Sequence, residues 1–243
     1  MAQRVEMEVN YKWIYIALII LLQGTLASAQ ILNIQKRSPK YDYRPLHFGF
    51  EIGFNYIDFD IQPIETLQSL PGLYSIESAD RPGITLLLIS DLRIGEHLNL
   101  RFTPGISYTQ RDLFYRITDP FSGTIFETFK QVESTFIEFP LLMKFKSVRV
   151  NNYRAYLLTG VKFMLDMASQ EKVDDPDLLR IIKSELSYEF GVGFDFYFDY
   201  FKFSPQIKTS FGINNVLVND GTIYTAGIDQ LQTRAVLISF CFE

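Results

Sequence analysis

The sequence predicts an all-β protein: an eight-stranded antiparallel transmembrane β-barrel preceded by a cleaved signal peptide. Three observations predict it. Bulky apolar residues alternate with small or polar residues in eight separate segments, as strands with two different faces require. The connections between these segments are alternately long and short. The N-terminus carries a short apolar run that ends in a cleavage motif.

The N-terminal 29 residues are typical of a secretory signal peptide. The apolar run from Trp13 to Leu22 is shorter than the roughly 20 residues that a spanning helix needs, and Ala27-Ser28-Ala29 supplies an A-x-A cleavage site. An N-terminal anchor helix is the alternative, but Gln23, Gly24 and Thr25 interrupt the apolar run. Translation starts at Met1 or Met7. We therefore expect a signal peptide over 1–29, a polar periplasmic lead-in over 30–45 and the barrel over 46–243.

The first expected strand shows the alternation most simply. Phe48, Phe50, Ile52 and Phe54 alternate with residues that are small or polar, such as Glu51. The same pattern recurs over 84–94, 99–108, 137–146, 156–165, 186–198, 201–212 and 236–242. Strands of this length fit the smallest transmembrane barrels, which are OmpA-like in size.

The connections support the same fold. Those expected at 59–82, 110–132, 168–183 and 214–231 are long, and those at 95–97, 151–152 and 199–200 are short. Outer-membrane barrels have short periplasmic turns and long outer loops, and an even strand count places both termini on the periplasmic side. We therefore expect the outer membrane as the location, with its lipid in contact with the barrel.

A soluble eight-stranded barrel would bury its apolar face instead. The aromatic residues of that face, among them Phe190, Phe194 and Phe196, are too many for so narrow an interior. With the apolar face toward lipid, Cys241 points inward as a small packing residue. The charged residues that this assignment places in the lumen are Glu51, Asp91, Arg93, Arg101, Glu138, Lys144, Lys162, Glu189, Asp195, Lys202 and Lys208. Acids and bases nearly balance, which favours a cross-linked network over a conduction path.

Few residues in the sequence suggest catalysis or metal binding. His47 and His97 both belong at the periplasmic side, and no catalytic set can be placed on the outer loops, so we expect no enzymatic activity. No His/Cys metal cluster is present, and Asp174-Asp175-Pro176-Asp177 lacks the ligand spacing of a calcium loop. The net charge of −5 argues against nucleic-acid binding. No cofactor and no small-molecule substrate is expected.

Specific motifs add a family resemblance. The segments 39–50 (PKYDYRPLHFGF), 99–105, 140–145, 151–154, 188–195 and 200–205 (YFKFSP), with Asn214, Asn215 and Arg234, resemble the PorT family of outer-membrane proteins. The resemblance implies a component of the type IX protein secretion system and gliding motility, in which a larger partner forms the pore. The resemblance identifies no catalytic residues in this sequence. Glu243 after Phe242 departs from the general barrel pattern of a terminal aromatic residue.

Two functions follow as hypotheses. The first is a non-enzymatic secretion accessory that binds other type IX components at its periplasmic rim, through the lead-in residues Lys36, Arg37, Lys40, Tyr41, Asp42 and Arg44. The second is a general small barrel that stabilises the envelope or presents adhesive outer loops. The sequence leaves open the identity and stoichiometry of partners and any ligand of the loops.

Overall fold

The computed structural model describes residues 37, 41–64, 73–118, 125–169, 181–218, 225 and 227–243. The expected signal peptide lies outside these residues, as do Lys36 and Lys40. In the part of the chain that is described, no helix is long and apolar enough to cross a membrane.

The described chain is almost entirely antiparallel β-structure, which confirms the predicted fold class. A short 3-10 helix, η1 (Tyr41–Tyr43), precedes ten strands. They are β1 (Leu46–Pro63), β2 (Leu73–Asp80), β3 (Pro82–Arg93), β4 (Leu98–Phe102), β5 (Gly105–Thr118), β6 (Ile125–Lys146), β7 (Tyr153–Asp166), β8 (Ser184–Tyr197), β9 (Lys202–Gly212) and β10 (Ile228–Phe242).

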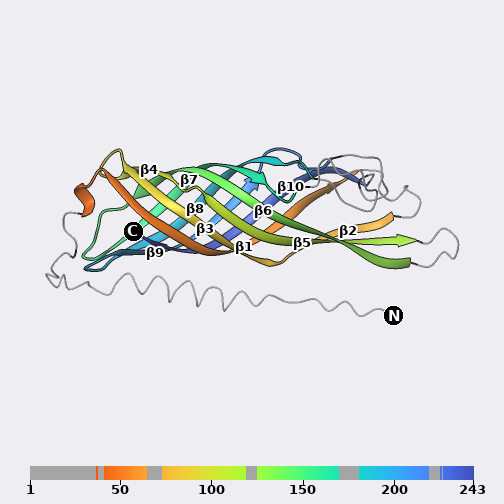
Figure 1. The fold of residues 1–243 in the computed structure, drawn as a ribbon, viewed down its shortest axis with the longest axis horizontal. Helices are drawn as coiled ribbons and strands as arrows, with labels where there is room; N and C mark the ends of the chain where they lie inside the picture. Colours follow the sequence, from red (N-terminus) through yellow and green to blue (C-terminus); the bar gives the residue numbers. More distant parts are fainter. Residues whose placement is uncertain are drawn as a thin grey trace, which may run out of the picture. The chain divides into compact units, whose positions relative to one another are not determined.

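The strand pairings form a circuit. The sheet runs β1-β10-β9-β8-β7-β6-β4-β3, and β3 pairs back to β1, so the ladder returns to its first strand (Figure 1). β5 continues β4 along β6, and β2 lies on the far side of β5. The backbone hydrogen bonds of these ladders are therefore made inside the protein, as a bilayer requires.

The structure has ten strands where the sequence predicts eight, because the predicted strand 99–108 is divided into β4 and β5 and because β2 lies within the predicted connection 59–82. β4 and β5 keep one register against β3 on both sides of Thr103 and Pro104, since Ser90 pairs with Phe102 and Ile84 with Tyr108. Pro104 has no N–H to give to the ladder, which explains the break. β2 and β3 are separated at Arg81, where the register against β5 shifts by one residue.

The long connections expected at 59–82 and 110–132 are wrong in extent, because strands occupy most of both ranges. Beyond about residue 56 the alternation continues with its polarity reversed. Ile57 and Phe59 point inward and are buried, whereas Asp60 points outward and is exposed. This reversal indicates that the outward face has left lipid and entered water, while the strands continue.

The outward face of the strands forms an apolar belt. Phe48 is 68% exposed, Leu88 67% and Phe190 48%, whereas the inward Glu51, Arg101 and Cys241 are fully buried. Each large apolar side chain that passes from water to lipid stabilises the inserted state by roughly 1.5–3 kcal/mol. Tyr56, Tyr108 and Tyr188 lie where the belt gives way to polar residues, as an aromatic girdle does.

The barrel has two different ends. The turn end contains η1, the start of β1, the connections at 94–97, 147–152 and 198–201, and Glu243. The loop end contains the last residues of β1, β5, β7 and β9 and the first residues of β2, β6, β8 and β10. Buried apolar side chains gather toward the loop end: Phe59, Leu113, Tyr115, Val132, Ile181, Val216, Ile228 and Leu231.

Candidate functional site: the ion-paired lumen and the turn end

A chain of alternating charges fills the lumen near the turn end. Arg101 Nη2 lies 2.6 Å from Asp91 Oδ2 and 2.6 Å from Glu243 Oε1. Lys202 Nζ lies 2.8 Å from Glu243 Oε2 and 3.9 Å from Asp195 Oδ1. Lys144 Nζ completes this turn-end chain at 2.9 Å from Asp195 Oδ1. These side chains are almost fully buried, so their charges must neutralise one another rather than rely on water.

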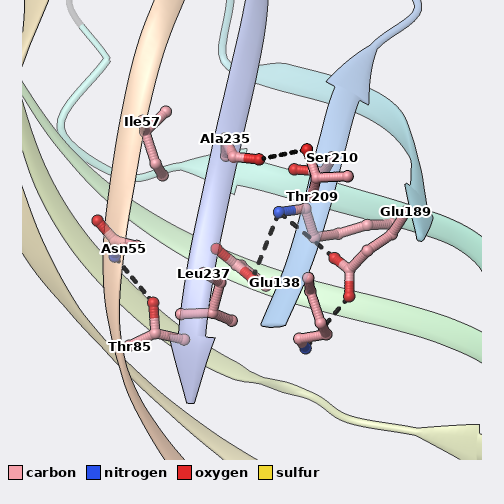
Figure 2. A pocket seen from close by; sticks show the side chains of 11 residues that line it. Asn55, Ile57, Thr85, Glu138, Glu189, Thr209, Ser210, Ala235 and Leu237 are labelled. Carbon is pink, nitrogen blue, oxygen red and sulfur yellow. Dashed lines mark hydrogen bonds and ion pairs between the residues drawn. The ribbon is translucent and has the colours of Figure 1, made fainter. Parts of the chain in front are cut away.

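A second chain lies further along the lumen. Lys208 Nζ joins Glu51 at 3.0 Å and Glu189 at 3.1 Å. Lys162 Nζ lies 3.7 Å from Glu189 and 3.9 Å from Glu138, and Figure 2 shows both carboxylates beside the cavity at this level. We call this set the middle chain. Its residues come from β1, β6, β7, β8 and β9, so it ties opposite walls of the barrel together.

The cavity beside the middle chain is small. It has a volume of about 10 Å³ and is bordered by Asn55, Thr85, Glu138, Lys162 and Ala235, among others. That is room for about one water molecule. Asn55 Nδ2 donates to Thr85 Oγ1 at 2.8 Å, so a hydrogen-bonded polar pair lines one side of the cavity (Figure 2). Side chains therefore occupy this level of the lumen, as the width of an eight-stranded barrel leads one to expect.

One residue of the predicted lumen set lies apart from both chains. Arg93 is half-buried at the turn end, where its Nε donates to Gly95 O at 3.3 Å and its guanidinium lies 5.8 Å from the ring centre of Tyr43. The strand alternation predicts that the Arg93 side chain points inward, but β3 ends at this residue. The guanidinium therefore reaches the rim instead of the lumen.

The sequence reasoning missed Glu243, which the turn-end chain needs at its centre. The alternation itself contained the information, because Cys241 points inward, Phe242 outward, and the next residue must point inward again. Arg111 was missed too. It is buried between Phe59 and Phe136, with its guanidinium 4.0 Å from the Phe59 ring centre, in a range that the sequence analysis assigned to a connection.

Tyr41 packs against the turn end of the barrel. Its ring stacks on His47 at a centroid distance of 4.1 Å, and its hydroxyl donates to Glu243 Oε2 at 3.2 Å. The ammonium of Lys202 lies 4.8 Å from the centre of the same ring. Tyr41 thus covers the last links of the turn-end chain. Burial raises the pKa of the Tyr41 hydroxyl, so it stays a neutral donor at physiological pH.

Asp42 holds η1 in place through two arginines. Its carboxylate oxygens lie 3.0 Å from Arg154 Nη2 and 3.1 Å from Arg149 Nη1, and the Tyr197 hydroxyl donates to it at 3.2 Å. Burial raises the pKa of Asp42, but the charges of Arg154 and Arg149 outweigh it and lower that pKa below its usual 3.8. The contact is therefore complete above pH 3.8 and is lost as the pH falls through the folded-state pKa.

The remaining lead-in residues differ in their contacts. The Arg37 backbone N–H donates to Asn152 Oδ1 at 2.8 Å, and its side chain lies 3.4 Å from Asp199. Arg44 is exposed, and its backbone N–H bonds to Tyr41 O at 3.2 Å. Binding of a partner through Tyr41 or Asp42 would require η1 to leave the barrel, whereas the Arg37 and Arg44 side chains are accessible where they lie.

The two histidines of the turn end contact backbone carbonyls. His47 Nε2 lies 2.8 Å from Tyr41 O, and His97 Nδ1 lies 3.0 Å from Lys146 O. Within the described ranges, no three His, Cys, Asp or Glu residues gather as metal ligands do.

A closed antiparallel ladder with an apolar outer belt and an ion-paired interior defines a transmembrane β-barrel. The family model of the outer membrane protein beta-barrel domain matches residues 29–218, and the chain belongs to this family. That membership places the protein in the outer membrane.

Several solved structures are similar to this chain at low sequence identity. Neisserial surface protein A is 8% identical, with a TM-score of 0.43 over 82% of this chain and 98% of that chain. OprG from Pseudomonas aeruginosa is 11% identical, with a TM-score of 0.42 over 86% and 98%. Ail of Yersinia pestis, solved with the heparin analogue sucrose octasulfate, is 9% identical, with a TM-score of 0.37 over 80% and 96%. No curated protein matches the chain.

Proposed function

We propose that this protein is a non-enzymatic accessory component of the type IX secretion system that binds other components at its turn end. In this proposal the turn end is the periplasmic rim. The observation that supports this proposal is that motifs resembling the PorT family lie together at the turn end. Asp42 from 39–50 contacts Arg154 from 151–154, and Lys202 from 200–205 lies against Tyr41. Segments far apart in the sequence thus build one rim.

The ion-paired lumen supports a role without conduction. The two charge chains cross-link the interior, and the cavity beside the middle chain holds about one water molecule. Transport would require both chains to break, at a cost of several kcal/mol for each separated buried pair. In this proposal the lumen charges serve structure, and function lies at the rims.

Exposed aromatic side chains at the turn end provide a contact surface for a partner. Tyr200 is 98% exposed and Tyr43 78% exposed. Tyrosine is favoured at interfaces because it offers a large apolar area and a polar tip. Both side chains lie outside the ion-paired chains, so their removal leaves the barrel interior unchanged.

The experiment is gene deletion followed by complementation. We expect deletion to abolish secretion of the organism's exported proteins and Y43A/Y200A to restore it only partly, while F129A at the loop end restores it fully. Cross-linking in intact cells from position 37 or 44 then identifies the partner. Unchanged secretion in the deletion strain would refute the proposal.

A second candidate is a general small barrel with an adhesive or envelope-stabilising role. The extension of β5 and β6 beyond the belt favours it, because this hairpin exposes Phe114 and Phe129 to water. Shortening the hairpin distinguishes the two functions. Loss of surface binding with intact secretion supports the second candidate, and lost secretion with intact surface binding supports the first.

A further inference from the structure

Near the loop end the described part of the barrel wall lacks backbone pairing between β1 and β2. β1 pairs with β10 from Phe50 to Pro63, but its ladder with β3 ends at Tyr56 and Pro82. β2 pairs with β5 on one edge only. Among the described residues no backbone hydrogen bond joins β1 to β2, and Figure 1 shows the two strands separating toward the loop end. We call the two facing edges, residues 57–63 and 73–80, the seam.

The local sequence explains why no ladder forms across the seam. The side chain of Asp58 accepts the Phe59 N–H at 2.8 Å, and the Ser78 hydroxyl contacts both Asp58 Oδ1 and, at 3.4 Å, the Phe59 nitrogen. This N–H is therefore satisfied by side chains instead of the facing backbone. Side-chain contacts of this kind compete with backbone pairing, and they are weaker than a continuous ladder of backbone hydrogen bonds.

The seam lies in water and not in lipid. The apolar belt ends at Tyr56 on β1 and at Ile84 on β3, and the outward residues beyond it are polar. Edge strands with unpaired N–H and C=O groups in water are templates for another strand. Beyond the contact of Ser78 with Asp58 and Phe59, both edges of the seam are thus available to an extended segment from the aqueous phase.

The two faces of the seam differ in chemistry. On the inner face Phe59, Ile61 and Ile76 pack in the loop-end apolar cluster. On the outer face Asp60 and Glu77 are exposed, and Glu77 lies near the guanidinium of Arg116, which pairs with Glu127. A strand that enters the seam therefore meets apolar side chains on one side and carboxylates on the other.

We propose that the seam receives, by strand addition, an extended segment of a partner protein in which apolar and basic residues alternate. Period 2 directs every second side chain into the apolar cluster and the others toward Asp60 and Glu77. A second copy of this chain is disfavoured as the occupant, because pairing two such edges brings like carboxylates together. The inference does not rest on the proposed function, since it concerns the opposite end of the barrel.

Binding of a synthetic peptide to the full protein in detergent micelles tests the proposal. The probe is a labelled peptide of about seven residues, the length of the free edge on β1, with alternating lysine and valine. Fluorescence anisotropy gives its affinity, and hydrogen exchange locates it. We expect binding, with slower amide exchange at 57–63 and 73–80 and unchanged exchange in β9.

Two control peptides and two variants separate strand addition from simple charge attraction. A peptide with all lysines before all valines, and an alternating peptide with N-methylated backbone, should bind much more weakly. The D60N/E77Q variant should lose affinity roughly tenfold, since two exposed ion pairs are removed. E133Q, an exposed outward carboxylate on β6 away from the seam, should bind as the unaltered protein does.

Three results would overturn the inference. The first is equal binding of the block or N-methylated peptide, because neither can form the alternating ladder. The second is a dimer in which the seam amides are already protected without peptide, because a second copy would then occupy the edges. The third is an unaltered affinity in D60N/E77Q.

Discussion

Replacing Arg101 by methionine tests whether the turn-end chain holds the barrel together. The Arg101 side chain is fully buried on β4 and lies between Asp91 and Glu243. In R101M, Glu243 keeps Lys202 at 2.8 Å, whereas Asp91 keeps only neutral donors such as Asn99. Removal of one partner from a buried ion pair typically costs about 3–5 kcal/mol, because an uncompensated charge remains. We expect the free energy of unfolding to fall by about that amount.

The matched control is R116M on β5. Arg116 forms an ion pair of similar length, 2.8 Å, with Glu127, but both side chains are more than half exposed. Such an exposed pair contributes little to stability because water screens both charges. Adding D91N to R101M should recover part of the loss, because it removes the unpaired charge, and the double-mutant cycle gives the coupling between the two side chains.

The assay is equilibrium unfolding by urea in lipid vesicles, followed by far-UV circular dichroism. Tryptophan fluorescence does not serve, because the chain has a single tryptophan, Trp13, in the expected signal peptide. If R101M and R116M lose equal stability, the buried chain contributes no more than a surface pair and the reasoning is refuted.

Three further predictions concern other parts of the barrel. D42N should release η1, seen as faster amide exchange at residues 41–45, and acidification through the folded-state pKa of Asp42 should do the same to the unaltered protein, with no change at neutral pH. G193A should destabilise by about 1–3 kcal/mol because its Cβ meets the Tyr156 ring, whereas G95A, with nothing within 4 Å, should be neutral in urea unfolding. Cys241 should react with a maleimide only after unfolding, and labelling of the native protein would contradict its burial.

The strand faces were predictable from the sequence because a single rule, period 2, decides them. It gave the inward direction of Glu51, Asp195 and Lys208 without knowledge of any contact. Which of the inward charged side chains form ion pairs with each other was not predictable. Lys144 on β6 reaches Asp195 on β8 across the intervening β7, and such a pair depends on the width and register of the closed barrel.

The extent of the strands was harder to predict than the direction of their side chains. A search for apolar residues on the lipid side stops at Tyr56, whereas β1 continues to Pro63 with apolar residues on the opposite face. The reversal at Ile57 and Asp58 is visible in the sequence, but it identifies a strand only if one expects the barrel to extend beyond the bilayer. The missing β1–β2 ladder depends on the Asp58 and Ser78 side-chain contacts, which the alternation does not reveal.

The position of Glu243 links closure of the barrel to neutralisation of its lumen. Without it, the turn-end chain contains three cations, Arg101, Lys144 and Lys202, against the two carboxylates Asp91 and Asp195. Docking of β10 between β1 and β9 brings in the Glu243 carboxylate and balances the charges. Because an unbalanced buried cation is costly, the turn end reaches its stable state only when the last strand is in place. We therefore expect E243Q to weaken the β1–β10 closure most, measured as faster amide exchange at the turn-end half of β10 than in β7. Equal exchange in the two strands would show that closure does not depend on this charge.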